Sequence, residues 1–123
     1  MKRKIKIIAG KLELGAWLNE TETASKVFQA LPITSTVNTW GDEIYFTIPV
    51  DAKPEDAKEL VSLGDIAYWP PGKAMCIFFG KTPISKGNEI KPASAVNIIG
   101  KVEGDLKLLQ KVRDGEAIII QPA

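Results

Sequence analysis

The stretch Gly64-Asp-Ile-Ala-Tyr-Trp-Pro-Pro-Gly-Lys-Ala-Met-Cys-Ile-Phe-Phe-Gly-Lys-Thr-Pro-Ile-Ser85 is the most informative part of this chain. It contains two short apolar runs, Asp65–Trp69 and Ala74–Gly80, on either side of a Pro-Pro-Gly-Lys sequence. Apolar runs of this length that are bounded by Pro and Gly are typical of strands joined by a tight turn. The segment therefore predicts two neighbouring strands, with Pro71 and Gly72 at the centre of a type II turn.

Outward from this segment, the chain reads mostly as further short strands. Lys4–Ala9 and Lys11–Leu18 alternate polar and apolar residues on either side of Gly10, which predicts a hairpin. Alternation or a richness in Thr, Val and Ile predicts the remaining strands at Ile33–Trp40, Glu43–Val50, Ser94–Glu103 and Glu116–Gln121. Lys81–Ala93 is expected to be a polar loop because Pro and Gly recur in it.

Short helices are expected between these strands. Asn19 followed by Glu22 signals a helix start, and Pro32 ends the helical spacing of apolar residues that follows. One or two helical turns are expected within Asp51–Leu63, and a short helix over Leu106–Val112. Many short strands with two or three short helices predict a mostly β protein, a closed antiparallel β-barrel in which helices cover the open ends.

Length and composition limit the class of protein. A chain of 123 residues fits a single domain, expected here over 1–123, and 45% apolar with 25% charged residues is typical of an ordered globular protein. The net charge is only +1 and the arginines are Arg3 and Arg113 alone, so neither nucleic acid nor a membrane surface is an expected partner. No apolar run suits a signal peptide or a bilayer span, and we expect a cytoplasmic protein.

The absence of histidine excludes several kinds of site. Ser-His-Asp and Cys-His catalysis and zinc sites of mixed His and Cys all require it. Cys76 lies in an apolar run and is expected to be buried and inert. Asp42 and Glu43 are adjacent on a predicted strand, so their side chains point to opposite faces and joint metal binding is not expected. We expect no metal and no cofactor.

In the order of its elements the chain resembles the cyclophilin fold, and more closely the small bacterial and archaeal proteins of the cyclophilin-like family, whose biochemical role is unassigned. The general likeness is carried by Gly10–Leu31, by Ile98–Val112 and by the final Ala117-Ile-Ile-Ile. The more specific marks are Tyr68-Trp-Pro-Pro-Gly72 and Phe78-Phe-Gly-Lys-Thr-Pro83. The resemblance covers nearly the whole chain and implies a cyclophilin-like barrel.

The same resemblance argues against prolyl isomerisation. True cyclophilins use an arginine, in an aromatic-His-Arg strand motif, to weaken the amide conjugation of the substrate. The matching strand here is Ile44-Tyr-Phe-Thr-Ile-Pro49, with Thr47 where the arginine would stand. The loop after Pro83 also lacks the tryptophan and histidine of the isomerases. No catalytic residue of that family can be assigned to this chain.

The resemblance implies that the strand after Gly41 lies near the Trp69 turn and the Phe79–Pro83 loop. The candidate groove there comprises Trp40, Glu43, Tyr45, Trp69 and Thr82. Aromatic walls with a carboxylate and a hydroxyl fit a small molecule or a short peptide. Two plainer interpretations stand beside this one: the aromatic residues fill the barrel and cover its mouth, and Glu43 is a solvated strand residue.

Three functions remain open for such a barrel. We favour a non-catalytic module that binds a small molecule or a peptide. The second is an enzyme, either a weak or atypical prolyl isomerase or an activity not yet assigned to the fold. The third is an interaction subunit that buries its aromatic surface against another protein or, as a homo-oligomer, against its own copy. A concave pocket beside Trp69 would favour the first, and a flat aromatic patch the third.

Overall fold

Residues 2–123 are described by a computed structural model, and Met1, the first residue of the expected domain, lies outside them. The described strands form a single 9-stranded sheet in which the order is β3-β9-β1-β2-β8-β6-β7-β5-β4. Every pairing is antiparallel. The strands are β1 (Arg3–Ala9), β2 (Leu12–Leu18), β3 (Ile33–Thr36), β4 (Asn38–Thr39), β5 (Glu43–Thr47), β6 (Asp65–Trp69), β7 (Ala74–Phe78), β8 (Asn97–Glu103) and β9 (Ala117–Pro122).

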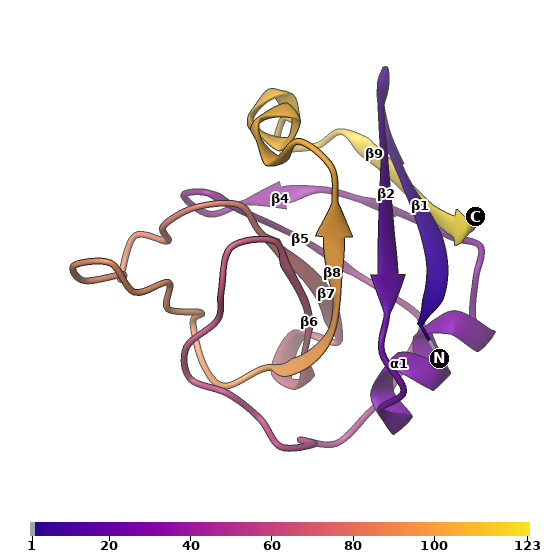
Figure 1. Cartoon of the computed structure of the whole chain (residues 1–123), viewed down its shortest axis with the longest axis horizontal. Helices are drawn as coiled ribbons and strands as arrows, with labels where there is room; N and C mark the ends of the chain where they lie inside the picture. The colour runs from indigo at the N-terminus through magenta and orange to yellow at the C-terminus, as the bar shows by residue number, and fades with distance from the viewer. Residues whose placement is uncertain (1) are drawn as a thin grey trace.

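The chain itself closes this sheet into a barrel. β3 and β4 stand at the two ends of the strand order, yet only Val37 separates them in the sequence. The amide of Val37 donates to the carbonyl of Glu116 over 2.8 Å, and Ser35 Oγ donates to the carbonyl of Thr47 over 2.6 Å. The expected mostly β protein with an antiparallel barrel is confirmed, and the barrel is nearly closed (Figure 1).

Two helices flank the strands, with η2 (Leu106–Lys111), a 3₁₀ helix, at the top of Figure 1 and α1 (Glu22–Gln29) at the bottom. Each buries apolar side chains against the barrel core, Val27 from α1 and Leu109 from η2. The side chain of Thr21 caps α1 by accepting from the amide of Ala24 over 3.1 Å. The expected cap, Asn19, instead accepts from the amide and hydroxyl of Thr21. Among residues 2–123, no helix is long and apolar enough to cross a bilayer.

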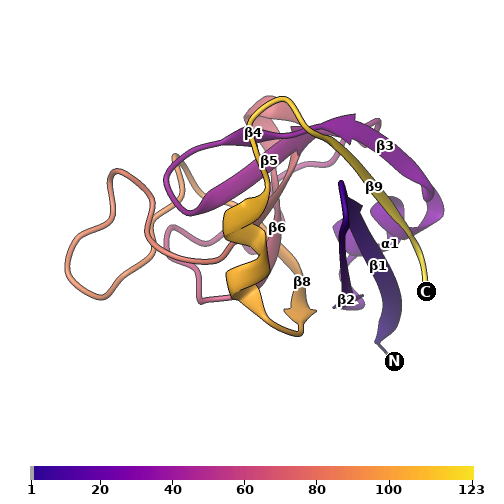
Figure 2. The ribbon, with the colours of Figure 1, turned by 90° about the horizontal axis from the view of Figure 1, so that it is seen from above.

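In β6, β7 and most of β5, the residues on both faces of the sheet are buried or half-buried. Ile44 and Phe46 of β5 point into the barrel, whereas Glu43 and Tyr45 alternate with them on the outer face. A smaller apolar cluster lies on that outer face, and its buried members are Ala67, Cys76, Phe78, Ile90 and Val96. The segment 79–96, which projects to the left in Figures 1 and 2, supplies Ile90 and Val96 and so covers part of this face.

Two local predictions are wrong. Residues 51–63 form no helix, because Lys58 and Val61 pair in bridges with Val96 and Ile90 of the covering segment. Asp56 also has a φ of 47°, which a helix does not allow.

The Pro-Pro-Gly sequence forms a 3₁₀ turn, η1 (Pro70–Gly72), rather than a type II turn. The left-handed residue is Lys73, with φ 47°, and not Gly72. The proline rings set the φ of the first two residues of η1, which suits a tight helical turn.

Candidate functional site

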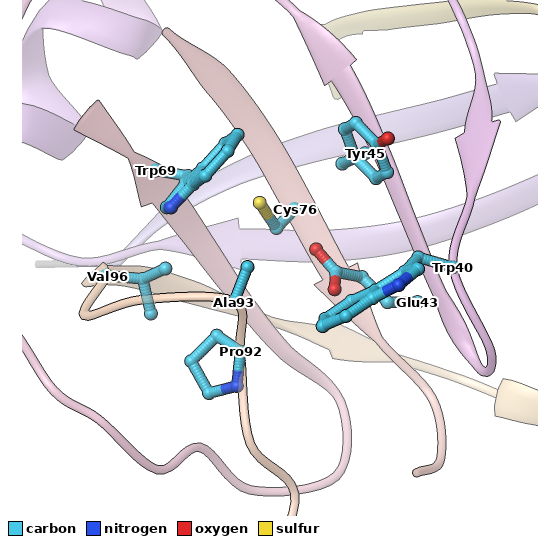
Figure 3. A pocket seen from close by; sticks show the side chains of 8 residues that line it. All are labelled: Trp40, Glu43, Tyr45, Trp69, Cys76, Pro92, Ala93 and Val96. Atoms are coloured by element: carbon cyan, nitrogen blue, oxygen red, sulfur yellow. The ribbon is translucent and has the colours of Figure 1, made fainter. Parts of the chain in front are cut away.

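A cavity of about 300 Å³ lies on the outer face of β5, β6 and β7. We call it the outer-face cavity. Its walls are mostly aromatic or aliphatic, with one carboxyl group and one thiol on the floor (Figure 3). It is lined by Trp40, Glu43, Tyr45, Trp69, Cys76, Pro92, Ala93 and Val96.

The hairpin between β4 and β5 places Trp40 and Glu43 side by side. The amide of Trp40 donates to the carbonyl of Glu43 over 2.9 Å, and the reverse bond measures 3.2 Å. Such a reciprocal pair closes a two-residue turn, here Gly41-Asp42, and leaves the flanking side chains on one face. Gly41 has a φ of 60°, which favours glycine at the first central position of this turn.

Strand register brings the other floor residues to the same place. Tyr45 of β5 pairs directly with Cys76 of β7, and Ala67 of β6 pairs with Cys76 from the other side. Because side chains two residues apart on a strand share a face, Glu43 lies on the face of Tyr45, and Trp69 on that of Ala67. Residues from three neighbouring strands thus converge on one surface.

The indole of Trp69 is fixed from two sides. Its Nε1 donates to Ser94 Oγ over 2.6 Å, which ties β6 to the covering segment. Gly72 packs against the ring so closely that a Cβ atom there would lie 2.6 Å from Cε3 of Trp69. The glycine in η1 therefore serves the close approach to Trp69.

Thr82, which was expected in the groove, does not line the cavity. Its side chain is buried, and its hydroxyl bonds to the carbonyl of Lys91. Ser85 Oγ accepts from the amides of Thr82 and Lys91, each over 3.0 Å. These bonds close the base of the loop that leads to Pro92 and Ala93 of the cavity wall.

Glu43 is a buried acid, and the interpretation of it as a solvated residue is wrong. Its exposed fraction is 5%. Burial raises its pKa to about 7, an effect that a hydrogen bond from Cys76 partly opposes. The residues that line the cavity include no lysine or arginine, so no cation there compensates the carboxylate. Near neutral pH this group therefore exchanges between a neutral donor and an anion.

Cys76 is buried, as expected, with 2% of its surface exposed. Its polar neighbour was not expected: burial first, and then the charge and hydrogen bond of Glu43, raise the pKa of the thiol well above its ordinary value. The protonated thiol therefore acts as a hydrogen-bond donor to Glu43. Strand pairing across β5 and β7 creates this contact, and the sequence alone carries no signal of that register.

Of the five residues expected in the groove, four line the outer-face cavity, namely Trp40, Glu43, Tyr45 and Trp69. The three aromatic side chains are half-buried on the outside of the barrel. The interpretation that they fill the barrel is wrong, because Phe46 and Tyr68 occupy the interior instead. Sequence reasoning missed Pro92, Ala93 and Val96, since small residues in a loop carry no chemical signature of a site.

No arginine of the chain reaches this surface. Thr47, at the end of β5, is exposed on the face of Tyr45. Arg3 Nη2 donates to Ser25 Oγ over 2.8 Å, and its guanidinium lies 5.5 Å from the ring centroid of Phe28. Arg113 lies in the turn before β9, where its amide bonds to Glu116. Neither lines the cavity.

Comparison with known proteins supports the architecture. The model of the family described as Cyclophilin-like matches residues 3–121. The solution structure of a hypothetical protein from Archaeoglobus fulgidus is 46% identical, superposes with a TM-score of 0.84, and covers 99% of this chain and 95% of its own. No curated protein matches the sequence.

A more distant solved structure is McbB in complex with tryptophan. It is 12% identical with a TM-score of 0.70, and the match covers 96% of this chain. The present chain spans 44% of the McbB chain. At this identity the likeness concerns the fold.

Proposed function

We propose that this chain, which belongs to the cyclophilin-like family, binds a small molecule in its outer-face cavity. The observation that carries the proposal is the cavity itself, a hollow of about 300 Å³ with aromatic walls and one buried carboxyl group. Ligand pockets typically start at ~300 Å³, and they combine apolar walls with a few polar groups that orient the ligand. The size favours a compact ligand over an extended peptide.

The shape of the surface supports ligand binding over association with another protein. Interaction patches are commonly flat and exposed. Here Trp40, Tyr45 and Trp69 are half-buried and form walls around a floor, and the buried Pro92 also lines the cavity. Trp69 is already fixed by Ser94 and Gly72, so little of its freedom remains to be lost on binding.

The lack of a charged donor supports a binding role over prolyl isomerisation. Lowering a rotation barrier of ~18–20 kcal/mol calls for a donor directed at the twisted amide. The cavity offers a carboxyl and a thiol but no arginine or lysine. The tryptophan bound to McbB does not identify the ligand of this chain, since only the fold is shared. Tryptophan is a reasonable compound to include in a test library.

A thermal-shift screen with metabolites and short peptides tests the proposal. Binding to the folded state alone raises the melting temperature, and the rise should disappear in Trp69→Ala. Trp17→Ala is the matched control, because Trp17 lies on β2 under Lys2 and does not line the cavity. Trp17→Ala should keep the rise, and a rise that survives Trp69→Ala would place the ligand elsewhere and overturn the proposal.

A further inference from the structure

We propose that the ligand of the outer-face cavity is a small organic ammonium whose cationic head lies between the aromatic rings and the carboxylate of Glu43. This inference rests on the proposed function, because it names the class of ligand for the same cavity. It follows from which groups surround the cavity and from which groups are missing there.

The aromatic groups come from three directions. Trp40 extends from the hairpin, Tyr45 from β5 and Trp69 from the end of β6, and Figure 3 shows Trp40 and Trp69 on opposite sides of the cavity floor. The faces of such rings carry partial negative charge, and several rings around one point form the cages that hold quaternary ammonium groups. A purely apolar ligand would use their area but not their charge.

The one carboxyl group of the lining lies between these rings. Glu43 projects its oxygens into the space next to Trp40, as Figure 3 shows. The ionisable group that contacts it is the thiol of Cys76 from β7, whereas the hydroxyl of Tyr45, on its own strand, points away from it in Figure 3. The covering segment contributes only Pro92, Ala93 and Val96, and no lysine or arginine lines the cavity. A cation from outside is therefore the missing partner of this carboxylate.

Other classes of ligand fit these groups less well. An anion would meet the carboxylate and the negative faces of the rings without any cationic residue to bind it. A neutral apolar molecule would seal Glu43 further from water and leave it without a charged partner. An ammonium satisfies both the rings and the carboxylate.

Proton linkage follows from the same contact. Burial raises the pKa of Glu43 to about 7, and a bound cation would favour the ionised form, so binding would release a proton below that pH. Affinity for the cation should therefore rise about tenfold per pH unit below the pKa of Glu43 and level off above it. A neutral ligand should show no such rise.

Choline and its neutral carbon isostere, in which a tert-butyl group replaces the trimethylammonium group, form a matched pair of probes. Each is titrated into the whole chain at millimolar concentration, and heteronuclear NMR follows the indole signals of Trp40 and Trp69. We expect choline to bind at least tenfold more tightly than the isostere above pH 7. Glu43→Gln should weaken choline binding and reduce that preference to the part that the rings alone supply, and Trp17→Phe, a change outside the cavity, should preserve it.

The outcomes separate this inference from the proposed function. If the isostere binds in the cavity as tightly as choline, the ammonium assignment is wrong and the binding function stands. If choline binds equally well to Glu43→Gln, the carboxylate does not select the ligand and the assignment is again wrong. If neither probe shifts the indole signals, the ammonium assignment fails, and the library screen with Trp69→Ala then decides the binding function by itself.

Discussion

Replacing Glu43 by glutamine should make the folded protein more stable above neutral pH. Burial raises the pKa of Glu43 from 4.5 to about 7 in the folded chain, so the folded state holds a proton that the unfolded chain releases. The contribution of this group to stability is fully present below pH 4.5 and is lost as the pH rises to about 7. A shift of this size corresponds to roughly 3 kcal/mol of stability lost across that window.

Glutamine cannot ionise and has nearly the same shape, so the variant escapes this loss. Urea unfolding across the pH range should give similar free energies for both proteins near pH 4.5 and a variant more stable by about 3 kcal/mol above pH 7. Hydrogen bonds from Thr23 lower the pKa of Glu55, whose contribution is lost at acidic pH in both proteins. The difference between the two curves therefore isolates Glu43.

Glu13→Gln serves as the control, because Glu13 is an exposed carboxylate paired with Lys6 over 3.0 Å on the far hairpin. Removing an exposed pair should change stability by less than about 1 kcal/mol. Parallel pH curves for the wild type and Glu43→Gln would refute the reasoning, since they would mean that Glu43 titrates as it does in the unfolded chain.

Three further predictions concern the same surface. A protease-coupled assay on a proline-containing peptide should show no turnover near that of a true cyclophilin, and such turnover would mean that the cavity supplies a donor by another route. The thiol of Cys76 should react slowly with thiol reagents in the native state, and rapid labelling would contradict its burial. Cys76→Ala should lower the unfolding free energy by about 1 to 2 kcal/mol, and it should raise the pKa of Glu43 further because the hydrogen bond from the thiol is lost. Tyr45→Ala and Trp69→Ala should each lower the unfolding free energy by less than about 2 kcal/mol, whereas the interior control Phe46→Ala should lower it by ~3–5 kcal/mol. If both variants lose as much stability as Phe46→Ala, these two rings serve the fold and not a binding site.

The alternation of polar and apolar residues, together with the turn residues, is enough to predict most of the strands. The hairpin at Gly10 and the strands around Pro70–Gly72 carry strong local signals, and the structure confirms them. The segment 51–63 does not form its expected helix, because its backbone finds partners in the distant residues Val96 and Ile90. Such long-range bridges leave no local pattern in a sequence.

Part of the candidate site can also be predicted from local sequence, and part depends on long-range pairing. Trp40, Tyr45 and Trp69 are conspicuous by residue type, and the cyclophilin-like resemblance pointed to the surface that they share. The burial of Glu43 and its contact with Cys76 depend on how β5 pairs with β7 and on a loop that folds back over them. Neither dependence is visible before the strands are paired, so the sequence predicts a carboxylate in the groove without indicating its burial, and a thiol among apolar neighbours only.

Whether the outer-face cavity receives a ligand is tested most directly by mapping chemical-shift changes over the whole chain during titration with a compound that raises the melting temperature. We predict that the largest changes fall at Trp40, Glu43, Tyr45 and Trp69 and that Trp17 stays unchanged. Changes concentrated away from these four residues, with their signals unmoved at saturation, would contradict the assignment of this cavity as the binding site.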